Sequence, residues 1–288
     1  MRNWLLAPQP IERLVVLRIL VPLAILGFLS GRLSHADAWL TDRGFQVPNL
    51  GVDDYRQPLY LPAIPVWAAW SVAALTVTSA LAFVIGWRAR LAGALLGACL
   101  LYLALADRLA SFTVSKLGPI LVLALVMTPC GAAYSLDAWL LRRRDPARSP
   151  PTHVSGGNVR FFQILLVVFY CASGTCKARG DWLSTTPVIW SHLHDSYQTW
   201  IAYQVARALP GGAWLGLQWL VLAFEALAPL WFALAHTRLV ALAVGFGMHL
   251  FIGLSFGPVL WFALLMIGLL AGCFAPLPWL QRALRVAR

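Results

Sequence analysis

QILLVVFYCASGTCKARGDW, residues 163–182, is an apolar run that ends in a lysine, an arginine and a tryptophan. A helix that crosses a bilayer needs about 20 predominantly apolar residues, so this stretch predicts a membrane span. A charged head at a membrane boundary is costly unless it is paired, reaches water along its own stem or is used in chemistry. Lys177 is therefore the first candidate for a catalytic residue. The alternative is a lysine that anchors a helix end at the interface.

The composition of the whole chain predicts a membrane protein. Of the 288 residues, 60% are hydrophobic and 11% are charged, whereas soluble domains carry about 25% charged residues. So few polar side chains cannot cover a globule of this size. We therefore predict an all-α, polytopic transmembrane helical bundle. The net charge of +11 is spread over short loops between apolar runs, which indicates topology and not nucleic-acid binding.

Eight apolar runs are long enough to be candidate spans. They lie at roughly 14–31, 65–87, 91–110, 117–139, 161–176, 214–235, 238–256 and 258–275. The aromatic and polar stretch 182–212 predicts an interfacial helix in an outer loop instead. The basic, proline-containing stretch 141–159 predicts a cytoplasmic linker between halves of about 1–140 and 160–288, within a single transmembrane domain that covers residues 1–288.

The basic residues also predict the orientation of the chain. With eight spans and a cytoplasmic N-terminus, thirteen lysines and arginines fall inside and eight fall outside. This bias favours a bundle with both termini in the cytoplasm. Lys177 then lies at the outer face. In a bacterium this means an inner-membrane protein with a pocket that opens to the periplasm.

Charged residues within the apolar runs are few. Arg18 is the deepest, and an unpaired charge at the bilayer centre costs at least about 2.5–3.5 kcal/mol, so it needs a carboxylate, a carbonyl or water. Glu225 is the only glutamate inside a predicted span, while Asp107 and Asp137 lie near span ends. We expect some of these acids to neutralise Arg18 or to line the same cavity, in either a functional or a structural role.

Gln163, Tyr170 and Lys177 are seven residues apart and so share one helix face. This face would carry an amide, a phenol and an amine, with interhelical hydrogen bonding as the alternative role. His249 lies mid-span, either as a hydrogen-bonded core residue or as a proton carrier. The predicted pocket around Lys177 comprises Gln163, Tyr170, Arg179, Trp182, Glu225 and His249. No metal is expected, because His192 and His194 diverge on a helix and no cysteine pair or carboxylate cluster joins them.

Several segments together resemble one family. They are LRILVP at Arg18, PCGAAYSLDAWL from Pro129 to Leu140, the run from Gln163 to Trp182, Glu225 followed by Pro229, and GMHLFIG at His249. In order and spacing they resemble the HTTM membrane domain, the module shared with vitamin K-dependent γ-glutamyl carboxylase. The resemblance covers nearly the whole chain.

The resemblance implies a helical membrane domain whose outward pocket holds a lipophilic quinol, of the vitamin K or ubiquinol type. Lys177 matches the lysine that deprotonates the hydroquinone in the carboxylase. An amine that is partly desolvated beside Arg179 is more readily neutral and can then act as a base. One departure concerns the Asn-His pair that the carboxylase has before its fourth helix, where this sequence has Ser115 and Lys116.

Two classes of function follow from these residues. The first is a quinol-dependent enzyme, either a carboxylating lyase or an oxidoreductase, with Lys177 as the base. It would act on a membrane lipid or on a periplasmic peptide or protein. The second is a non-catalytic partner or scaffold subunit for a redox, processing or export protein. A transporter is less favoured, because no repeat or pair of discontinuous helices is visible.

Overall fold

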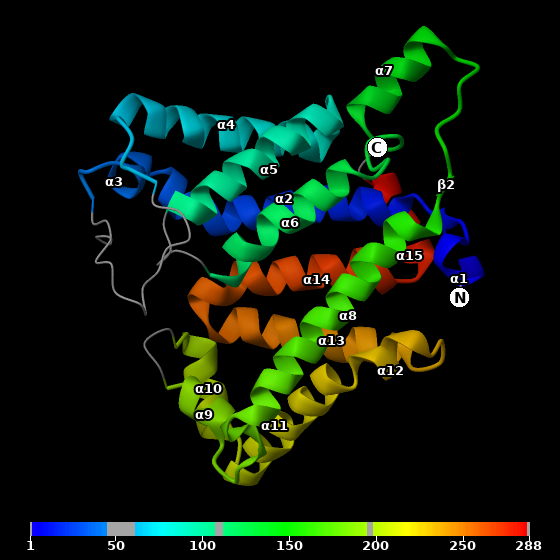
Figure 1. Cartoon of the computed structure of the whole chain (residues 1–288). Helices are drawn as coiled ribbons and strands as arrows, with labels where there is room; N and C mark the ends of the chain where they lie inside the picture. Colours follow the sequence, from blue (N-terminus) through cyan, green and yellow to red (C-terminus); the bar gives the residue numbers. More distant parts are fainter. Residues whose placement is uncertain (1, 45–60, 107–111, 195–197, 287–288) are drawn as a thin grey trace. The chain divides into compact units, whose positions relative to one another are not determined.

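The computed structural model describes residues 2–44, 61–106, 112–194 and 198–286, and these are mostly helical (Figure 1). The chain divides into two compact units. One unit, called the 14–154 unit here, is Leu14–Val154. The other, called the 155–288 unit, is Ser155–Arg288 together with Met1–Arg13. The boundary falls inside the stretch predicted as a linker, 141–159, although α7 continues into that stretch as far as Arg144.

The 14–154 unit is built around three long helices and one shorter apolar helix. Its elements are α2 (Glu12–Leu33, which begins two residues before the unit), α3 (Ala36–Leu40), α4 (Val66–Ile85), α5 (Ala89–Ala106), α6 (Thr113–Val126), α7 (Leu136–Arg144) and the two-residue strand β2 (His153–Val154). Along the chain α4 packs on α5 and α5 on α6, as Figure 1 shows in cyan and green.

A tight turn between α4 and α5 is fixed by two devices. Gly86 ends α4 in the left-handed region, with φ of 72°, and its N–H donates to the carbonyls of Ala82 and Phe83. Glycine tolerates this conformation without steric cost. Asp137 of α7 then accepts hydrogen bonds from the backbone N–H groups of Arg88 at 2.8 Å and Ala89 at 3.0 Å, which caps the start of α5.

The 155–288 unit contains the remaining helices. Its elements are α1 (Arg2–Leu6), the strand β1 (Gln9–Pro10), α8 (Gly156–Arg179), a 3-10 turn (Asp181–Leu183), α9 (Val188–His192), α10 (Trp200–Ala208), α11 (Gly211–Ala226), α12 (Ala228–Ala233), α13 (Arg238–Ser255), a second 3-10 turn (Gly257–Val259), α14 (Leu260–Phe274) and α15 (Leu277–Val286). Helix α8 packs against α11 and α14, and α13 packs against α14.

The outer surfaces of these helices are apolar. Val168 of α8 is 52% exposed and Leu220 of α11 is 53% exposed. Soluble proteins rarely leave extended apolar surfaces in water, whereas lipid-facing helices require them. Together with the length of the helices, this makes the chain an integral membrane protein with an all-α fold.

Among the described residues, six helices are long and apolar enough to cross a membrane. They are Glu12–Leu33, Val66–Ile85, Ala89–Ala106, Gly156–Arg179, Arg238–Ser255 and Gly257–Phe274. The other two predicted runs are helical but shorter. The run 117–139 lies on α6, which ends at Val126, and the run 214–235 is split between α11 and α12. The count of eight spans and the orientation stay predictions.

The loop 182–212, in which an interfacial helix was predicted, contains two short helices among its described residues, α9 and α10. In α10, Trp200 and Tyr203 are exposed while Ala202 and Ala206 are buried against Trp214 of α11. Helix α10 ends at Ala208, before Pro210, and α11 begins at Gly211. Proline disfavours the continuation of a helix, because it lacks the backbone N–H and clashes with the preceding turn. The exposed aromatic side chains suit a membrane–water interface.

Candidate functional site

A close helix crossing in the 155–288 unit positions the candidate site. A Cβ atom added to Gly174 of α8 would lie 2.6 Å from the backbone nitrogen of Ala226 on α11. Only a residue without a side chain permits this approach, as in other membrane helix pairs with small residues at their contact. The crossing brings the last turns of α8 and α11 together.

Lys177 and Glu225 form an ion pair beside this crossing. The Nζ atom of Lys177 lies 2.6 Å from Oε1 and 2.5 Å from Oε2 of Glu225, and it also donates to Oγ of Ser173 at 3.0 Å. The lysine side chain is 23% exposed and the glutamate 7% exposed. The carboxylate is therefore held inside the unit, while the ammonium lies at the boundary with the surroundings.

The segment that follows α8 closes over this pair. Lys177 Nζ lies 5.0 Å from the centre of the Trp182 ring, within the range of a cation–π contact. The fully buried Gln218 of α11 fixes the segment, because its Nε2 donates to the carbonyl of Trp182 and its Oε1 accepts from the N–H of Val188, both at 2.8 Å. These two hydrogen bonds fix the backbone at Trp182 and at Val188.

A second polar pair lies about two turns deeper along α8. The hydroxyl of Tyr170 and Nε2 of His249 on α13 are 2.8 Å apart, and both side chains are buried. Aromatic rings surround the pair, with Phe224 5.2 Å from the Tyr170 ring and Phe262 5.9 Å from the His249 ring, centre to centre. The second ring nitrogen of His249, Nδ1, is buried and has no hydrogen-bond partner in the described structure.

This arrangement combines proton-exchanging groups with an apolar surrounding. In the Lys177–Glu225 pair the ammonium can release a proton and the carboxylate can accept one, and the ammonium can stabilise a negative charge next to it. The unpaired Nδ1 of His249 is a polar atom in a dry, aromatic layer, where a missing hydrogen bond costs about 1–3 kcal/mol. A ligand hydroxyl or carbonyl would satisfy it. No group of three or more metal-ligating side chains lies together in the described ranges.

The structure brings together five of the predicted pocket residues. These are Tyr170, Lys177, Trp182, Glu225 and His249. The shared face of α8 predicted from the seven-residue spacing also points inward, since Gln163 and Tyr170 are buried and Lys177 is half-buried.

Gln163 and Arg179 lie apart from this group. Gln163 is at the opposite end of α8, where its Nε2 donates to the carbonyl of Cys273 at 2.6 Å and its Oε1 accepts from Arg160 at 2.7 Å. Arg179 is exposed at the end of α8. Lys177 was expected to lie beside the guanidinium of Arg179. The charged group that it contacts is instead the carboxylate of Glu225, with which it forms an ion pair.

Arg18 is held by backbone carbonyls, one of the three kinds of partner expected for it, and within the described residues no carboxylate forms an ion pair with it. Arg18 is 1% exposed and its guanidinium donates to backbone carbonyls of Cys130 at 2.8 Å, Ala133 at 3.4 Å and Tyr134 at 2.5 Å. Asp137 instead caps α5. Both residues belong to the 14–154 unit. Asp107 lies outside the described residues.

Sequence reasoning missed Ser173 and Gln218. Ser173 precedes Lys177 by four residues, and Gln218 precedes Glu225 by seven, so each shares a helix face with its charged partner. The seven-residue spacing that singled out Tyr170 and Lys177 on α8 recurs on α11. Applied to the second helix, the same rule would have found Gln218.

The fold and this site define a class: a polytopic helical membrane protein with an ion-paired lysine at the end of a span. The HTTM domain family matches residues 7–279, which is nearly the whole chain. The chain belongs to the HTTM domain family. Neither the curated proteins nor the solved structures contain a match to it.

Proposed function

We propose that this HTTM domain protein is an enzyme that removes a proton from a lipophilic, weakly acidic substrate of the quinol class. The HTTM domain is also found in vitamin K-dependent carboxylase. The observation that carries the proposal is the Lys177–Glu225 pair, buried on one side and reachable on the other, at the end of a span.

Lys177 and Glu225 have complementary roles in this proposal. In the ion pair the proton resides on Nζ of Lys177, which cannot accept another. Transfer of that proton to the Glu225 carboxylate leaves a neutral amine, and the amine then takes the proton of a substrate hydroxyl. The net result is one O–H bond broken on the substrate, one O–H bond formed on Glu225 and an ammonium left beside the new negative charge. An ammonium in a poorly hydrated site stabilises that charge strongly.

The surroundings of the pair suit a flat, lipophilic ligand. Trp182 and the rings around Tyr170 offer aromatic surface, and His249 Nδ1 offers an unpaired polar atom. A quinol supplies an acidic hydroxyl and a flat apolar ring when bound. Access from the bilayer would explain why such a site lies in a membrane domain. With both termini in the cytoplasm, as predicted, the pair would face the periplasm of a bacterial cell.

Quinol turnover by the detergent-purified full chain tests the proposal. Vitamin K hydroquinone and a short-chain ubiquinol are supplied in air, and bound quinone, quinone product and hydrogen peroxide are measured. Wild type is expected to convert quinol and dioxygen to quinone and hydrogen peroxide above the uncatalysed rate. Lys177→Ala and Lys177→Arg should lose this activity, because arginine keeps the charge but cannot deprotonate.

The only other lysine in the chain provides the matched control. Lys116 is exposed on α6, and Lys116→Ala and Lys116→Arg should turn over like wild type. If wild type neither binds nor oxidises quinol, and Lys177→Arg behaves as wild type in the host, the enzyme proposal fails. The chain would then be a non-catalytic partner or scaffold subunit, in which Lys177 is an interfacial anchor.

A further inference from the structure

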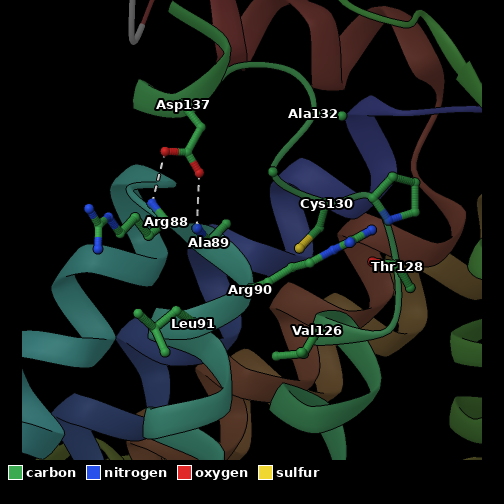
Figure 2. A pocket seen from close by; sticks show the side chains of 11 residues that line it. Arg88, Ala89, Arg90, Leu91, Val126, Thr128, Cys130, Ala132 and Asp137 are labelled. Carbon is green, nitrogen blue, oxygen red and sulfur yellow. Dashed lines mark hydrogen bonds between the residues drawn. The ribbon is translucent and has the colours of Figure 1, made fainter. Parts of the chain in front are cut away.

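A cavity in the 14–154 unit lies outside the site described above. It has a volume of about 510 Å³ and lies between the start of α5 and the segment that follows α6. Figure 2 shows the side chain of Arg90 extending across it toward Thr128 and Cys130, while Asp137 caps the backbone above. Leu91 and Val126 contribute an apolar wall. The cavity therefore combines a cationic side with an apolar side.

Two arginines, Arg88 and Arg90, line this cavity against one carboxylate, so its lining keeps a net positive charge. Asp137 is the one acidic residue in its lining, and its two carboxylate oxygens accept hydrogen bonds from the N–H groups of Arg88 and Ala89. Within the described ranges, the guanidinium of Arg90 has no hydrogen bond or ion pair, and the residue is exposed. An arginine at a cavity whose guanidinium forms no ion pair is available to an external anion.

An adjoining cavity extends the positive charge. It has a volume of about 260 Å³ and shares Gly131, Ala132 and Asp137 with the first cavity. Arg142 and Arg148 line it, together with Leu141. Leu91 is 52% exposed and Leu141 is 40% exposed, so apolar surface continues outward from both cavities.

We propose that these two cavities form a binding site for an anionic glycerophospholipid, in which Arg90 and Arg142 hold the phosphate and the exposed leucines contact the acyl chains. Two features favour a lipid over a free anion. The site joins unpaired arginines to exposed apolar side chains, and it lies in a unit whose helices are long enough to cross a membrane. Basic pockets beside transmembrane helices bind anionic lipid headgroups by the same combination.

Lipid retention by the full chain tests this site. The delipidated protein in neutral detergent is titrated with phosphatidylglycerol or with phosphatidylcholine of the same acyl chains, and bound lipid is counted by native mass spectrometry. Phosphatidylglycerol should bind more tightly than phosphatidylcholine. Arg90→Gln and Arg142→Gln should each weaken phosphatidylglycerol binding about fivefold, from a loss of about one favourable charge per site. Both arginines are exposed, so these variants should fold.

Arg144→Gln is the matched control. Arg144 is also an exposed arginine on α7, but it does not line either cavity, so its variant should bind phosphatidylglycerol like wild type. Equal losses of phosphatidylglycerol binding in all three variants would overturn the proposal, because the lipid would then be attracted by the basic surface in general and not by these cavities. Equal binding of the two lipids would also overturn it. Competition by millimolar inorganic phosphate would identify a free-anion site instead of a lipid site.

Discussion

At the scale of single residues, Lys177 and Glu225 are expected to matter for folding as a pair. A half-buried ion pair gains little over apolar side chains of similar size, but the loss of one partner leaves an uncompensated buried charge. Lys177→Met and Glu225→Leu should therefore each lower the free energy of unfolding by about 3 kcal/mol. The double variant should recover most of that loss, to within about 1 kcal/mol of wild type, because no lone charge remains.

Unfolding of the four proteins in detergent, followed by near-UV circular dichroism, gives the double-mutant cycle for this pair. Quinol turnover is measured on the same samples. The double variant should regain stability and stay inactive, which separates the structural role of the pair from its proposed chemical role. Additive losses would show that the two side chains do not depend on each other.

The Tyr170–His249 hydrogen bond makes a second residue-scale prediction. Tyr170→Phe leaves His249 buried with both ring nitrogens unpaired, since Nδ1 already has no partner among the described residues. An unsatisfied buried polar group costs about 1–3 kcal/mol, so the melting temperature of the variant should fall. Tyr102→Phe is the control, because Tyr102 is half-buried on α5 and makes no hydrogen bond within the described structure. Similar losses in the two variants would contradict this account.

At the scale of helices, the crossing of α8 and α11 depends on Gly174. Gly174→Ala would place a Cβ 2.6 Å from a backbone nitrogen, so the two helices must separate. Overpacking of this kind costs about 1–3 kcal/mol and should outweigh the gain of about 1 kcal/mol from the helix propensity of alanine. Separation of the helices should also lengthen the Lys177–Glu225 contact. Quinol turnover should therefore fall by more than the loss of folded protein accounts for.

Gly216→Ala is the control for the crossing. Gly216 lies on α11 with nothing within 4 Å of its added Cβ, so alanine should leave turnover unchanged and stability equal or slightly higher. Melting temperature and turnover of the two glycine variants are compared side by side. If Gly174→Ala is as stable and active as Gly216→Ala, the close approach is not needed for the site.

Hydropathy was sufficient to find the helices but not their breaks. Within the described residues each of the eight apolar runs contains helix, because backbone groups in a membrane must be satisfied within the segment. The break between α11 and α12 comes just before Pro229, yet Pro22 lies inside α2 and Pro119 inside α6 without ending them. Neighbouring helices can satisfy the carbonyls that a proline frees, and that depends on packing.

The site could be predicted one helix at a time. A period of seven placed Tyr170 and Lys177 on one face of α8, because side-chain direction follows from the helix repeat. The helix repeat does not predict which side chains on other helices these residues contact. Whether Glu225 meets Lys177 or Arg18 depends on which helices cross, and that depends on local contacts such as the one at Gly174.

At the scale of the whole molecule, the shortage of acids explains how arginines are accommodated. The chain has 22 lysines and arginines and 11 acids. Arg13 donates to the carbonyls of Gly272 and Cys273 near the end of α14, and Arg238 donates to carbonyls at the end of α12. Helix C-termini carry partial negative charge and unpaired carbonyls, so they can replace carboxylates as partners. Arg18 also uses carbonyls in place of carboxylates, but these belong to the turn between α6 and α7.

The number of spans depends on the short helix α6 and on α11 together with α12. Helix α11 alone has 16 residues and measures about 24 Å, short of a hydrocarbon core of about 30 Å. Together with α12 it would be long enough, and a broken helix can cross where neighbouring helices satisfy its backbone. The charge bias requires this crossing, because it places the basic C-terminal helix α15 in the cytoplasm.

Labelling of introduced cysteines by an impermeant maleimide distinguishes the possibilities. In a chain whose native cysteines are replaced, Ser149→Cys, Thr186→Cys and Ala283→Cys each put one thiol on an exposed site. With the predicted orientation, intact cells should label only Thr186→Cys, and the other two should react after permeabilisation. If Ala283→Cys is labelled with Thr186→Cys, α11 and α12 do not cross and the count of eight is wrong. If Ser149→Cys is labelled and Thr186→Cys is protected, either the orientation is reversed or α6 does not cross. Lys177 would then lie on the cytoplasmic side, and a periplasmic substrate would be ruled out.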